Sequence, residues 1–234
     1  MQYKDPYIEL CIEESPSVFK GLTQADKETL DEHHHFAVLK KGESIIKEGD
    51  RPKGLFCLVS GKAKIFKVGV GRREQIIRML RPHSFFCYRS LYSDSHYPFS
   101  VTALENAIVV IFEKQTISGL VRKNSDLAVR FIKLLTEELA FTNNRLISLT
   151  QKHVRGRIAE SILLLREVYG LDADGRTLKV LLSREDVAHL SNMTTSNAIR
   201  ILSDFASEGM ITLEGRRMII LDLRRLENVS GSGE

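Results

Sequence analysis

The side chains whose types and spacing could do chemistry gather between residues 195 and 203. Hydroxyl, amide and guanidinium groups can hydrogen bond to base edges, and an aliphatic side chain can pack on a thymine methyl group. Small hydroxyl residues at the start also let a helix approach a groove closely, and the face carries no carboxylate. The pattern predicts a DNA-reading helix, although periodicity alone also allows an ordinary surface helix in a helical hairpin. The residues of this face are Thr195, Ser196, Asn197, Ile199, Arg200 and Ser203.

Two short helices joined by a tight turn would position these side chains. Ser183 is a good N-cap with Asp186 as its acidic first-turn partner, and Thr194 or Thr195 caps the second helix. Asn192 lies in the turn, where a residue tolerant of left-handed backbone is needed. The apolar residues of the second helix follow the i, i+3, i+4, i+7 spacing of a buried stripe, which predicts a helix-turn-helix. This stripe comprises Ala198, Ile201, Leu202 and Phe205.

A β-hairpin is predicted directly downstream. Two β-prone runs flank Glu214-Gly215, which is a hairpin signal. A helix-turn-helix followed by a hairpin makes a winged helix, with Arg216 and Arg217 at the wing tip, where they could reach phosphates. A solvated turn is the alternative for these two residues. Arg184, at the start of the first helix, completes the predicted DNA contacts.

The composition is typical of a soluble globular protein. Hydrophobic residues make up 43% and charged residues 27%, and a net charge of +4 permits nucleic-acid binding without requiring it. The first 20 residues hold no signal peptide, and no apolar run is long enough to span a bilayer. Cys11, Cys57 and Cys87 lack Cys-x-x-Cys spacing, which argues against a disulfide framework or zinc ribbon and fits a reducing cytoplasm.

No motif supports enzymatic chemistry. The chain lacks a Gly-rich phosphate loop, a Gly-x-Ser-x-Gly elbow and a His-Glu-x-x-His sequence. Cys87 near His96 has no evident acidic partner that would complete a nucleophile–base pair. The adjacent His33, His34 and His35 cannot all face one ion from a strand or a helix, so no metal site is predicted. We therefore predict that the chain is not an enzyme.

Short β-prone runs alternate with glycine turns through the middle of the first half of the chain. Many short strands with regular turns favour a sandwich or barrel, and their close spacing leaves no room for βαβ units. The predicted strands are Phe36–Leu39, Ser44–Ile46, Leu55–Val59, Ala63–Val68, Gln75–Leu80, Val101–Leu104 and Ile108–Phe112.

Short elements are also predicted before the strands and before the helix-turn-helix. Pro6 and Pro16 are expected to interrupt any helix near the start of the chain, and a short capped helix is predicted from Thr23 to about His33. A short strand is predicted at Leu178–Leu182, leading into the helix-turn-helix.

The stretch from Ser125 to Thr150 contains no glycine or proline, and its leucines recur at helical spacing. We predict one long amphipathic helix whose apolar stripe is wider than one partner needs. One side can pack on the strands and another on a second copy of the same helix, in a parallel coiled-coil-like dimer. A helix wholly buried within one subunit is the alternative. The predicted dimer contacts are Phe131, Leu135, Leu139, Thr142, Leu146 and Leu149.

Two segments then carry a resemblance to a known family. Lys41–Asp50 contains similarly placed glycines and a Gly-Asp pair, and Gly54–Gly61 ends in a Ser-Gly turn, as in the cyclic-nucleotide-binding-type β-roll. Together with the winged helix, they make the chain resemble the Crp/Fnr family of bacterial transcription regulators, from about Gly21 to Leu223. The resemblance implies an α+β fold: an N-terminal double-stranded, jelly-roll-like β-roll, a long dimerisation helix and a C-terminal winged helix-turn-helix.

The domains that this resemblance implies divide the chain into four parts. Residues 1–124 would form the effector-sensing β-roll with its N-terminal helix, and residues 125–151 the dimerisation helix. Residues 152–228 would form the DNA-binding domain, with Gly156 near the family's hinge, and residues 229–234 a disordered tail.

The resemblance also implies an effector pocket, from which this sequence departs. Nucleotide-binding members hold the ribose with the Glu of a Gly-Glu pair and the cyclic phosphate with the Arg of an Arg-Ser pair. Here Cys87-Tyr88 replaces the first pair and Tyr97-Pro98 stands near the second, so cyclic AMP is not expected. An unidentified apolar or aromatic effector with one anionic group would suit the patch, unless its own aromatic rings fill it. The predicted pocket comprises Phe85, Phe86, Cys87, Tyr88, Arg89, Ser90, Tyr97, Thr142 and Asn143.

Two other sensing modes of the family find little support. Iron–sulfur members carry a cysteine cluster near the N-terminus, which Cys11 alone does not supply. No spacing singles out a haem ligand among His83, His96 and Cys87. The sequence therefore assigns no cofactor with certainty.

The expected partner is double-stranded DNA. A homodimer would hold two recognition helices about one DNA turn apart, which predicts a palindromic operator with half-sites roughly 34 Å apart. Arg200 is the predicted base contact, and Ser196 stands where the family usually has a Glu, so the familiar half-site is not expected. The resemblance also implies RNA polymerase as a partner, a cytoplasmic location and no contact with a membrane.

Overall fold

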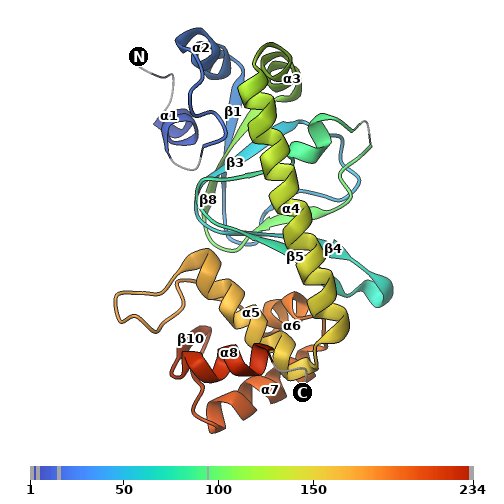
Figure 1. Cartoon of the computed structure of the whole chain (residues 1–234), viewed down its shortest axis with the longest axis vertical. Helices are drawn as coiled ribbons and strands as arrows, with labels where there is room; N and C mark the ends of the chain where they lie inside the picture. Colours follow the sequence, from blue (N-terminus) through green and yellow to red (C-terminus); the bar gives the residue numbers. More distant parts are fainter. Residues whose placement is uncertain (1–2, 4–5, 15–16, 94, 232–234) are drawn as a thin grey trace. The chain divides into compact units, whose positions relative to one another are not determined.

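The computed structural model describes residues 3, 6–14, 17–93 and 95–231 (Figure 1). The chain divides into two compact units, the first comprising residues 1–67 and 80–140 and the second residues 68–79 and 141–234. Within the described ranges, no helix combines the length and hydropathy that crossing a membrane requires.

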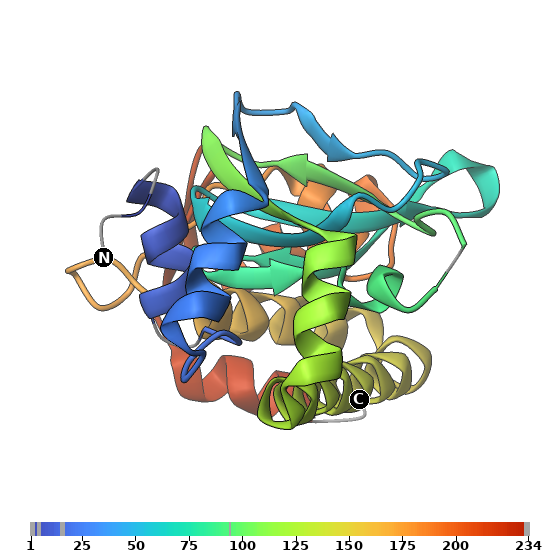
Figure 2. The same cartoon turned by 90° about the horizontal axis from the view of Figure 1, so that it is seen from above.

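Two N-terminal helices precede the strands of the first unit and lie side by side in Figure 2: α1 (Pro6–Glu13) and α2 (Gln24–Glu32). The expectation that Pro6 would interrupt a helix is wrong, because this proline is the first helical residue, where a fixed φ and a missing N–H cost nothing. Pro16 lies outside the described residues. The predicted cap of α2 is confirmed, since the Thr23 side chain accepts a hydrogen bond of 3.2 Å from the Asp26 N–H.

The strands form two four-stranded sheets in the described part of the chain, with the orders β1-β8-β3-β6 and β2-β7-β4-β5. Seven of these strands match the predicted ones to within two residues at either end, whereas the three-residue strand β6 was not predicted. The strands are β1 (His34–Leu39), β2 (Ser44–Ile46), β3 (Gly54–Ser60), β4 (Ala63–Val68), β5 (Glu74–Leu80), β6 (Ser84–Phe86), β7 (Ser100–Ala103) and β8 (Ala107–Glu113).

The turn between β3 and β4 requires a glycine. Gly61 has a φ of +81°, and a Cβ atom there would lie 2.4 Å from the Asn106 carbonyl oxygen. Only a residue without a side chain fits both the backbone conformation and this close approach. The Ser-Gly turn quoted in the family resemblance thus has a steric cause.

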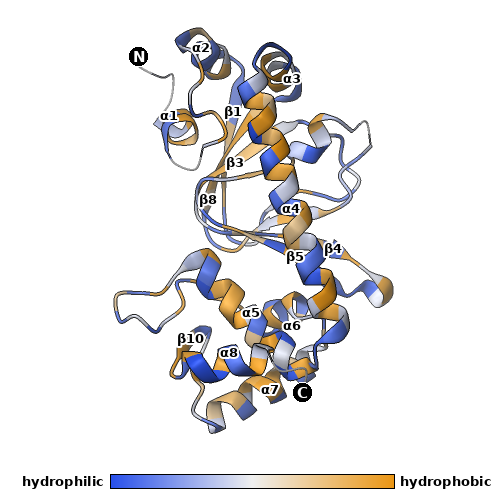
Figure 3. Ribbon diagram, in the orientation of Figure 1, coloured by the Kyte–Doolittle hydropathy of each residue, from blue (hydrophilic) through white to orange (hydrophobic). Residues whose placement is uncertain are grey.

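Two helices follow the strands: α3 (Lys114–Lys123) and α4 (Ser125–Gln151). The second matches the long helix predicted from its lack of glycine and proline. Leu127 and Phe131 are buried in the core of the first unit, together with residues of α1, β3 and β8. Along its whole length, α4 alternates between hydrophobic and hydrophilic bands (Figure 3), as expected of an amphipathic helix.

The second unit contains the remaining helices and a hairpin, and its core is formed by the apolar faces of the helix-turn-helix and the residues that lead into it. The predicted end of the first of these helices at Tyr169 is confirmed. The elements are α5 (Val154–Tyr169), α6 (Arg184–Leu190), α7 (Thr195–Ser207), β9 (Ile211–Glu214), β10 (Arg217–Ile220) and α8 (Leu223–Gly231).

Three local predictions for this unit are corrected. Gly156 lies inside α5, and the break from α4 falls at Lys152 and His153, where the extended His153 caps α5. Leu178–Leu182 is not a strand; Leu178 forms only an isolated bridge with Leu171. The predicted disordered tail is helical through Gly231, because Leu226 anchors α8 in the core; residues 232–234 lie outside the described residues.

Candidate nucleic-acid interface

The helix-turn-helix has the predicted caps. The Ser183 hydroxyl accepts a hydrogen bond of 3.0 Å from the Asp186 N–H and donates one of 2.7 Å to the Asp186 carboxylate. The Thr194 hydroxyl accepts a bond of 3.4 Å from the Asn197 N–H. Asn192 adopts left-handed backbone with a φ of 51°, as its place in the turn predicted. The two caps define where α6 and α7 begin, and Asn192 lies in the turn between these helices.

The two faces of α7 divide as the sequence pattern indicates. All four residues of the apolar stripe, from Ala198 to Phe205, are fully buried. On the opposite face Ile199 is 47% exposed. The predicted DNA contacts Ser196, Asn197, Ile199, Arg200 and Ser203 are exposed, and Thr195 is half-buried. The face is therefore free to enter a groove.

A carboxylate lies beside this face, which the residue pattern did not show. Arg200 Nη1 lies 3.4 Å from Asp204 Oδ2, one helical turn further along α7. Both side chains are exposed, so the ion pair is weak and a base or phosphate can compete with it. Arg200 thus remains able to bind DNA, at the cost of giving up this partner.

The wing is the two-stranded sheet of β9 and β10. Glu214 pairs with Arg217, so the loop is Gly215-Arg216, one residue later than the predicted Glu214-Gly215. Arg184 Nη2 donates a hydrogen bond of 2.9 Å to the Gly215 carbonyl. This bond fastens the start of α6 to the turn of the wing, and Arg216 and Arg217 are exposed there. The predicted basic contacts are therefore brought together.

Two arginines that sequence reasoning missed hold the far end of α7. Arg155 of α5 donates to both carboxylate oxygens of Glu208 at 2.8 Å, and its guanidinium lies over the Phe205 ring. Arg225 of α8 donates to the Glu208 carbonyl at 2.7 Å. The sequence holds no local signal for these contacts, because the partners lie 53 and 17 residues apart.

Several aromatic side chains of the predicted effector pocket are buried in the cores of the first unit. Phe86 and Tyr97 are buried in one core cluster with Phe56, and the Phe56 ring lies 5.2 Å from that of Phe86 and 6.4 Å from that of Tyr97. Phe85 belongs to a different core cluster from Phe86 and Tyr97, so the aromatic residues of the predicted pocket do not line a single cavity. Tyr88 is buried and donates a hydrogen bond of 2.9 Å to Glu138 of α4.

The polar residues of this segment also differ in their surroundings. Arg89 is exposed, whereas Ser90 is buried. Cys87 has a φ of 66°, a left-handed conformation that favours glycine, which agrees with its place opposite the family's Gly-Glu pair. Burial raises the pKa of the Cys87 thiol far above its usual range, so this group is not a nucleophile at neutral pH.

A metal site finds no support in the part of the chain that the structure describes, where no group of three His, Cys, Asp or Glu side chains could hold an ion.

Two protein-family models match separate parts of the chain. The cyclic nucleotide-binding domain covers residues 36–124, and the Crp-like helix-turn-helix domain covers residues 156–229. The chain belongs to the Crp/Fnr family of transcription regulators. It is thus a DNA-binding regulator, and its relatives and fold are those of regulators rather than of enzymes.

Known Crp/Fnr regulators resemble the whole chain. It is 26% identical to the CRP-like cAMP-activated global transcriptional regulator of Mycobacterium tuberculosis, over 89% of this chain and 94% of that protein. It is 24% identical to the fumarate and nitrate reduction regulatory protein of Escherichia coli, over 82% and 77% of the two chains. The structure of FixK2 from Bradyrhizobium japonicum superposes with a TM-score of 0.75 at 20% identity, over 85% and 98%.

The helix α4 of this Crp/Fnr chain presents an exposed apolar stripe. Leu139 and Leu146 are each 61% exposed, and Leu135 is also exposed. Phe131, a predicted dimer contact, is instead buried in the core of its own subunit, and Ile132, one residue along, is exposed in its place. Thr142 and Asn143 are exposed, and Leu149 is half-buried. Ile132, Leu135, Leu139, Thr142, Leu146 and Leu149, the seam residues, alternate in spacings of three and four.

Proposed function

We propose that this regulator acts as a homodimer that binds a palindromic operator. The observation that carries the proposal is the seam of α4, whose leucines are exposed at the spacing of a coiled coil. A single chain leaves this apolar surface in water, whereas a second copy would bury it. Two paired α4 helices would present two winged helices related by a two-fold axis, with half-sites roughly 34 Å apart.

The proposed roles in DNA binding follow from the exposed groups. Arg200 would contact a guanine or a neighbouring phosphate, and Ile199 would pack on a thymine methyl group. Ser196, Thr195, Asn197 and Ser203 would line the groove, while the basic residues around the wing would contact phosphates. As a family member the protein would work in the cytoplasm with RNA polymerase.

The control of DNA binding has two candidate forms. The protein could be gated by a small effector other than cyclic AMP, or it could bind DNA constitutively with a pocket that holds no ligand. The mycobacterial relative is described as cAMP-activated. In this chain Tyr88 replaces the ribose-binding glutamate and is already hydrogen bonded to Glu138. The packing of Phe56, Phe86 and Tyr97 favours the ligand-free form.

Selection of bound sequences from random DNA, with and without a cell metabolite extract, tests the proposal. We expect a two-fold symmetric consensus, and a consensus without symmetry would contradict the dimeric proposal. The dissociation constant for the selected operator is then measured with cyclic AMP, with extract and with neither. A shift with extract alone supports the effector-gated form, whereas one constant affinity supports the ligand-free form.

A further inference from the structure

Three consecutive residues, the last of α6 and the first two of the turn before α7, are held by polar contacts from two other helices. Arg145 of α4 donates a hydrogen bond of 2.6 Å to the Leu190 carbonyl. The Ser191 hydroxyl donates one of 2.8 Å to Ser161 of α5. Arg157 of α5 donates one of 3.0 Å to the Asn192 carbonyl. Because α7 begins just after this turn, its direction depends on these contacts.

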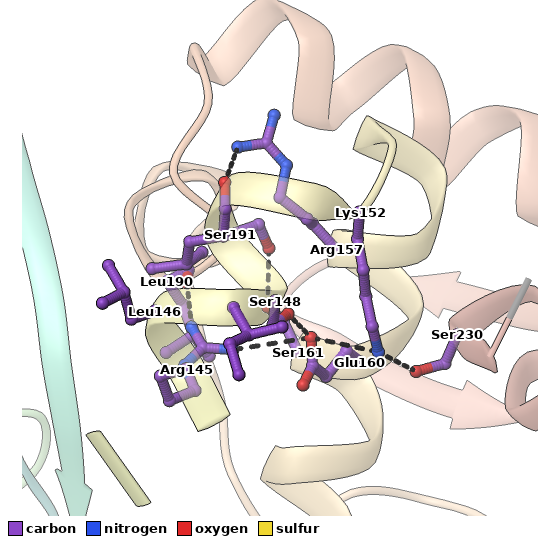
Figure 4. A network of polar contacts seen from close by, with 12 residues as sticks. Arg145, Leu146, Ser148, Lys152, Arg157, Glu160, Ser161, Leu190, Ser191 and Ser230 are labelled. Atoms are coloured by element: carbon purple, nitrogen blue, oxygen red, sulfur yellow. Dashed lines mark hydrogen bonds and ion pairs between the residues drawn. The ribbon is translucent and has the colours of Figure 1, made fainter. Parts of the chain in front are cut away.

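Among the three contacts, only that of Arg145 reaches the turn from the long helix α4. Its guanidinium also lies 4.0 Å from Glu160 of α5, and Figure 4 shows it pointing between the Leu190 carbonyl and this carboxylate. Glu160 Oε2 accepts a hydrogen bond from Ser148 and lies 3.5 Å from Lys152 Nζ. The last turns of α4, the start of α5 and the turn before α7 thus share one polar network.

The surroundings of Arg145 make this contact costly to maintain. The residue is only 9% exposed, and its burial lowers the pKa of its guanidinium while Glu160 partly opposes that effect. An apolar side chain of similar volume would fill the same space without the desolvation penalty. A guanidinium, however, has donors fixed in a planar fork, so it can hold a carbonyl and a carboxylate in one defined geometry. The contact therefore specifies an orientation more than it adds stability.

We propose that Arg145 is a positioning residue, which sets the angle between the recognition helix α7 and the last turns of α4. This proposal rests on the proposed dimer along α4. In such a dimer, the angle between α4 and α7 fixes the distance between the two recognition helices. Arg145 consequently determines which half-site spacing the dimer accepts, without touching DNA itself.

The test compares operators that differ only in spacing. The selected operator is lengthened or shortened by one base pair at its centre, and dissociation constants are measured for the full-length protein and for Arg145→Met. We expect the native protein to bind operators of altered spacing more weakly than the selected operator. In Arg145→Met the ratio of these dissociation constants should be roughly tenfold smaller, which corresponds to the loss of one charge-assisted hydrogen bond. The affinity for a duplex with a single half-site should not change, because the reading face is intact.

Two conservative variants keep the test decisive if Arg145→Met folds poorly. Arg145→Lys retains the charge but not the planar fork, and Glu160→Gln retains the size but not the charge of the partner. Both should lose part of the spacing discrimination while remaining folded dimers by size and thermal unfolding. Arg225→Met is the matched control, since it removes an arginine-to-carbonyl bond at the other end of α7 that makes no contact with α4.

Each result separates the two proposals. Full spacing discrimination in folded Arg145→Met or Arg145→Lys would overturn the positioning role and leave the dimeric operator proposal standing. An equal loss of spacing discrimination in Arg225→Met would also overturn the positioning role, because any weakening of the domain would then be enough to cause the loss. If the native protein selects no palindrome, the proposed function fails first, and the positioning role fails with it.

Discussion

At the scale of single residues, the DNA-reading face combines one strong donor with a competing acceptor. Arg200 has five N–H donors suited to guanine, but Asp204 already pairs with it at 3.4 Å. Ser196, in the position where the family usually has a glutamate, is exposed and supplies only a hydroxyl group. Arg200 should therefore provide most of the base discrimination on this helix.

We expect Arg200→Ala to weaken operator binding by about 1–3 kcal/mol and to relax the preference at one base position. Binding competition among operators with each substitution at that position measures the effect. Asp204→Asn is the control, because it breaks the same ion pair and leaves the arginine in place. If Asp204→Asn reproduced the loss, the ion pair rather than a base contact would be responsible.

The glycine at the β3–β4 turn predicts a stability effect. Gly61→Ala should lower the free energy of unfolding by about 3 kcal/mol, because positive φ and the clash with the Asn106 carbonyl add together. Gly42→Ala has a similar φ of +85° with no atom near the new Cβ, so it should cost only about 1–2 kcal/mol. Denaturant unfolding of the two variants measures the difference, and equal losses would rule out the steric clash.

At the scale of elements, α4 serves two partners with two faces. Leu127 and Phe131 pack into the core of the first unit, while Leu139 and its seam neighbours remain exposed. The wing is likewise supported from outside itself, since Arg184 of α6 holds its turn. Each element therefore has its position fixed by contacts distant in sequence.

The exposed face of α4 predicts the assembly state. Leu139→Glu should convert the dimer into a monomer, because two carboxylates would face each other in an apolar seam. Light scattering after gel filtration should then report the chain mass of 26.6 kDa rather than twice that value. Ala140→Glu places the same charge on the adjacent exposed residue outside the seam and should leave the dimer intact. A dimer that survives Leu139→Glu would place the interface elsewhere.

The loop before the helix-turn-helix predicts a pH dependence. Asp174 accepts hydrogen bonds from the Arg176 and Thr177 N–H groups and from the Thr177 hydroxyl, which lower its pKa from 3.8 to about 2. Because the folded-state pKa is depressed, the stabilisation is complete above pH 3.8 and is lost as the pH falls to about 2. Thermal unfolding of the native protein and Asp174→Asn should differ at pH 6 and converge near pH 2. A constant difference across this range would show that ionisation is not the cause.

At the scale of the whole molecule, DNA binding should combine a salt-dependent and a salt-independent part. Phosphate contacts release counterions, so each lost contact lowers the slope of log affinity against log salt by about 0.9. Base contacts change specificity and leave this slope nearly unchanged. The wing and the recognition helix should therefore be separable by experiment in the dimer.

If Arg216 contacts a phosphate in each subunit of the proposed dimer, Arg216→Ala should lower the salt slope by about 1.8. Ile199→Ala should instead leave the slope unchanged and weaken the preference at one thymine-containing position. Affinity measured at several salt concentrations distinguishes the two variants. An unchanged slope in Arg216→Ala would assign that residue to a solvated turn, and an unchanged base preference in Ile199→Ala would remove it from the groove.

Sequence alone determined the elements whose signals are local. These signals depend on residues within one or two turns of chain, so they could be recognised without knowledge of the fold. They are the caps at Ser183, Thr23 and Thr194, the helical spacing of α4 and the glycine turns. Together with the family resemblance they predicted the DNA-reading face. They did not show that α1 forms after a proline, or that Leu178–Leu182 lacks a strand partner.

Tertiary structure decided everything that depends on which distant residues meet. Phe131 is buried and Ile132 is exposed at neighbouring positions of one helix, and Phe86 and Tyr97 of the predicted pocket are buried in one core cluster. The tertiary structure also brought Arg145 to the Leu190 carbonyl, 45 residues away. Such contacts depend on how helices and sheets pack, and no periodicity encodes them. The sequence thus predicted which helix reads DNA, and the packing around it shows what holds that helix in place.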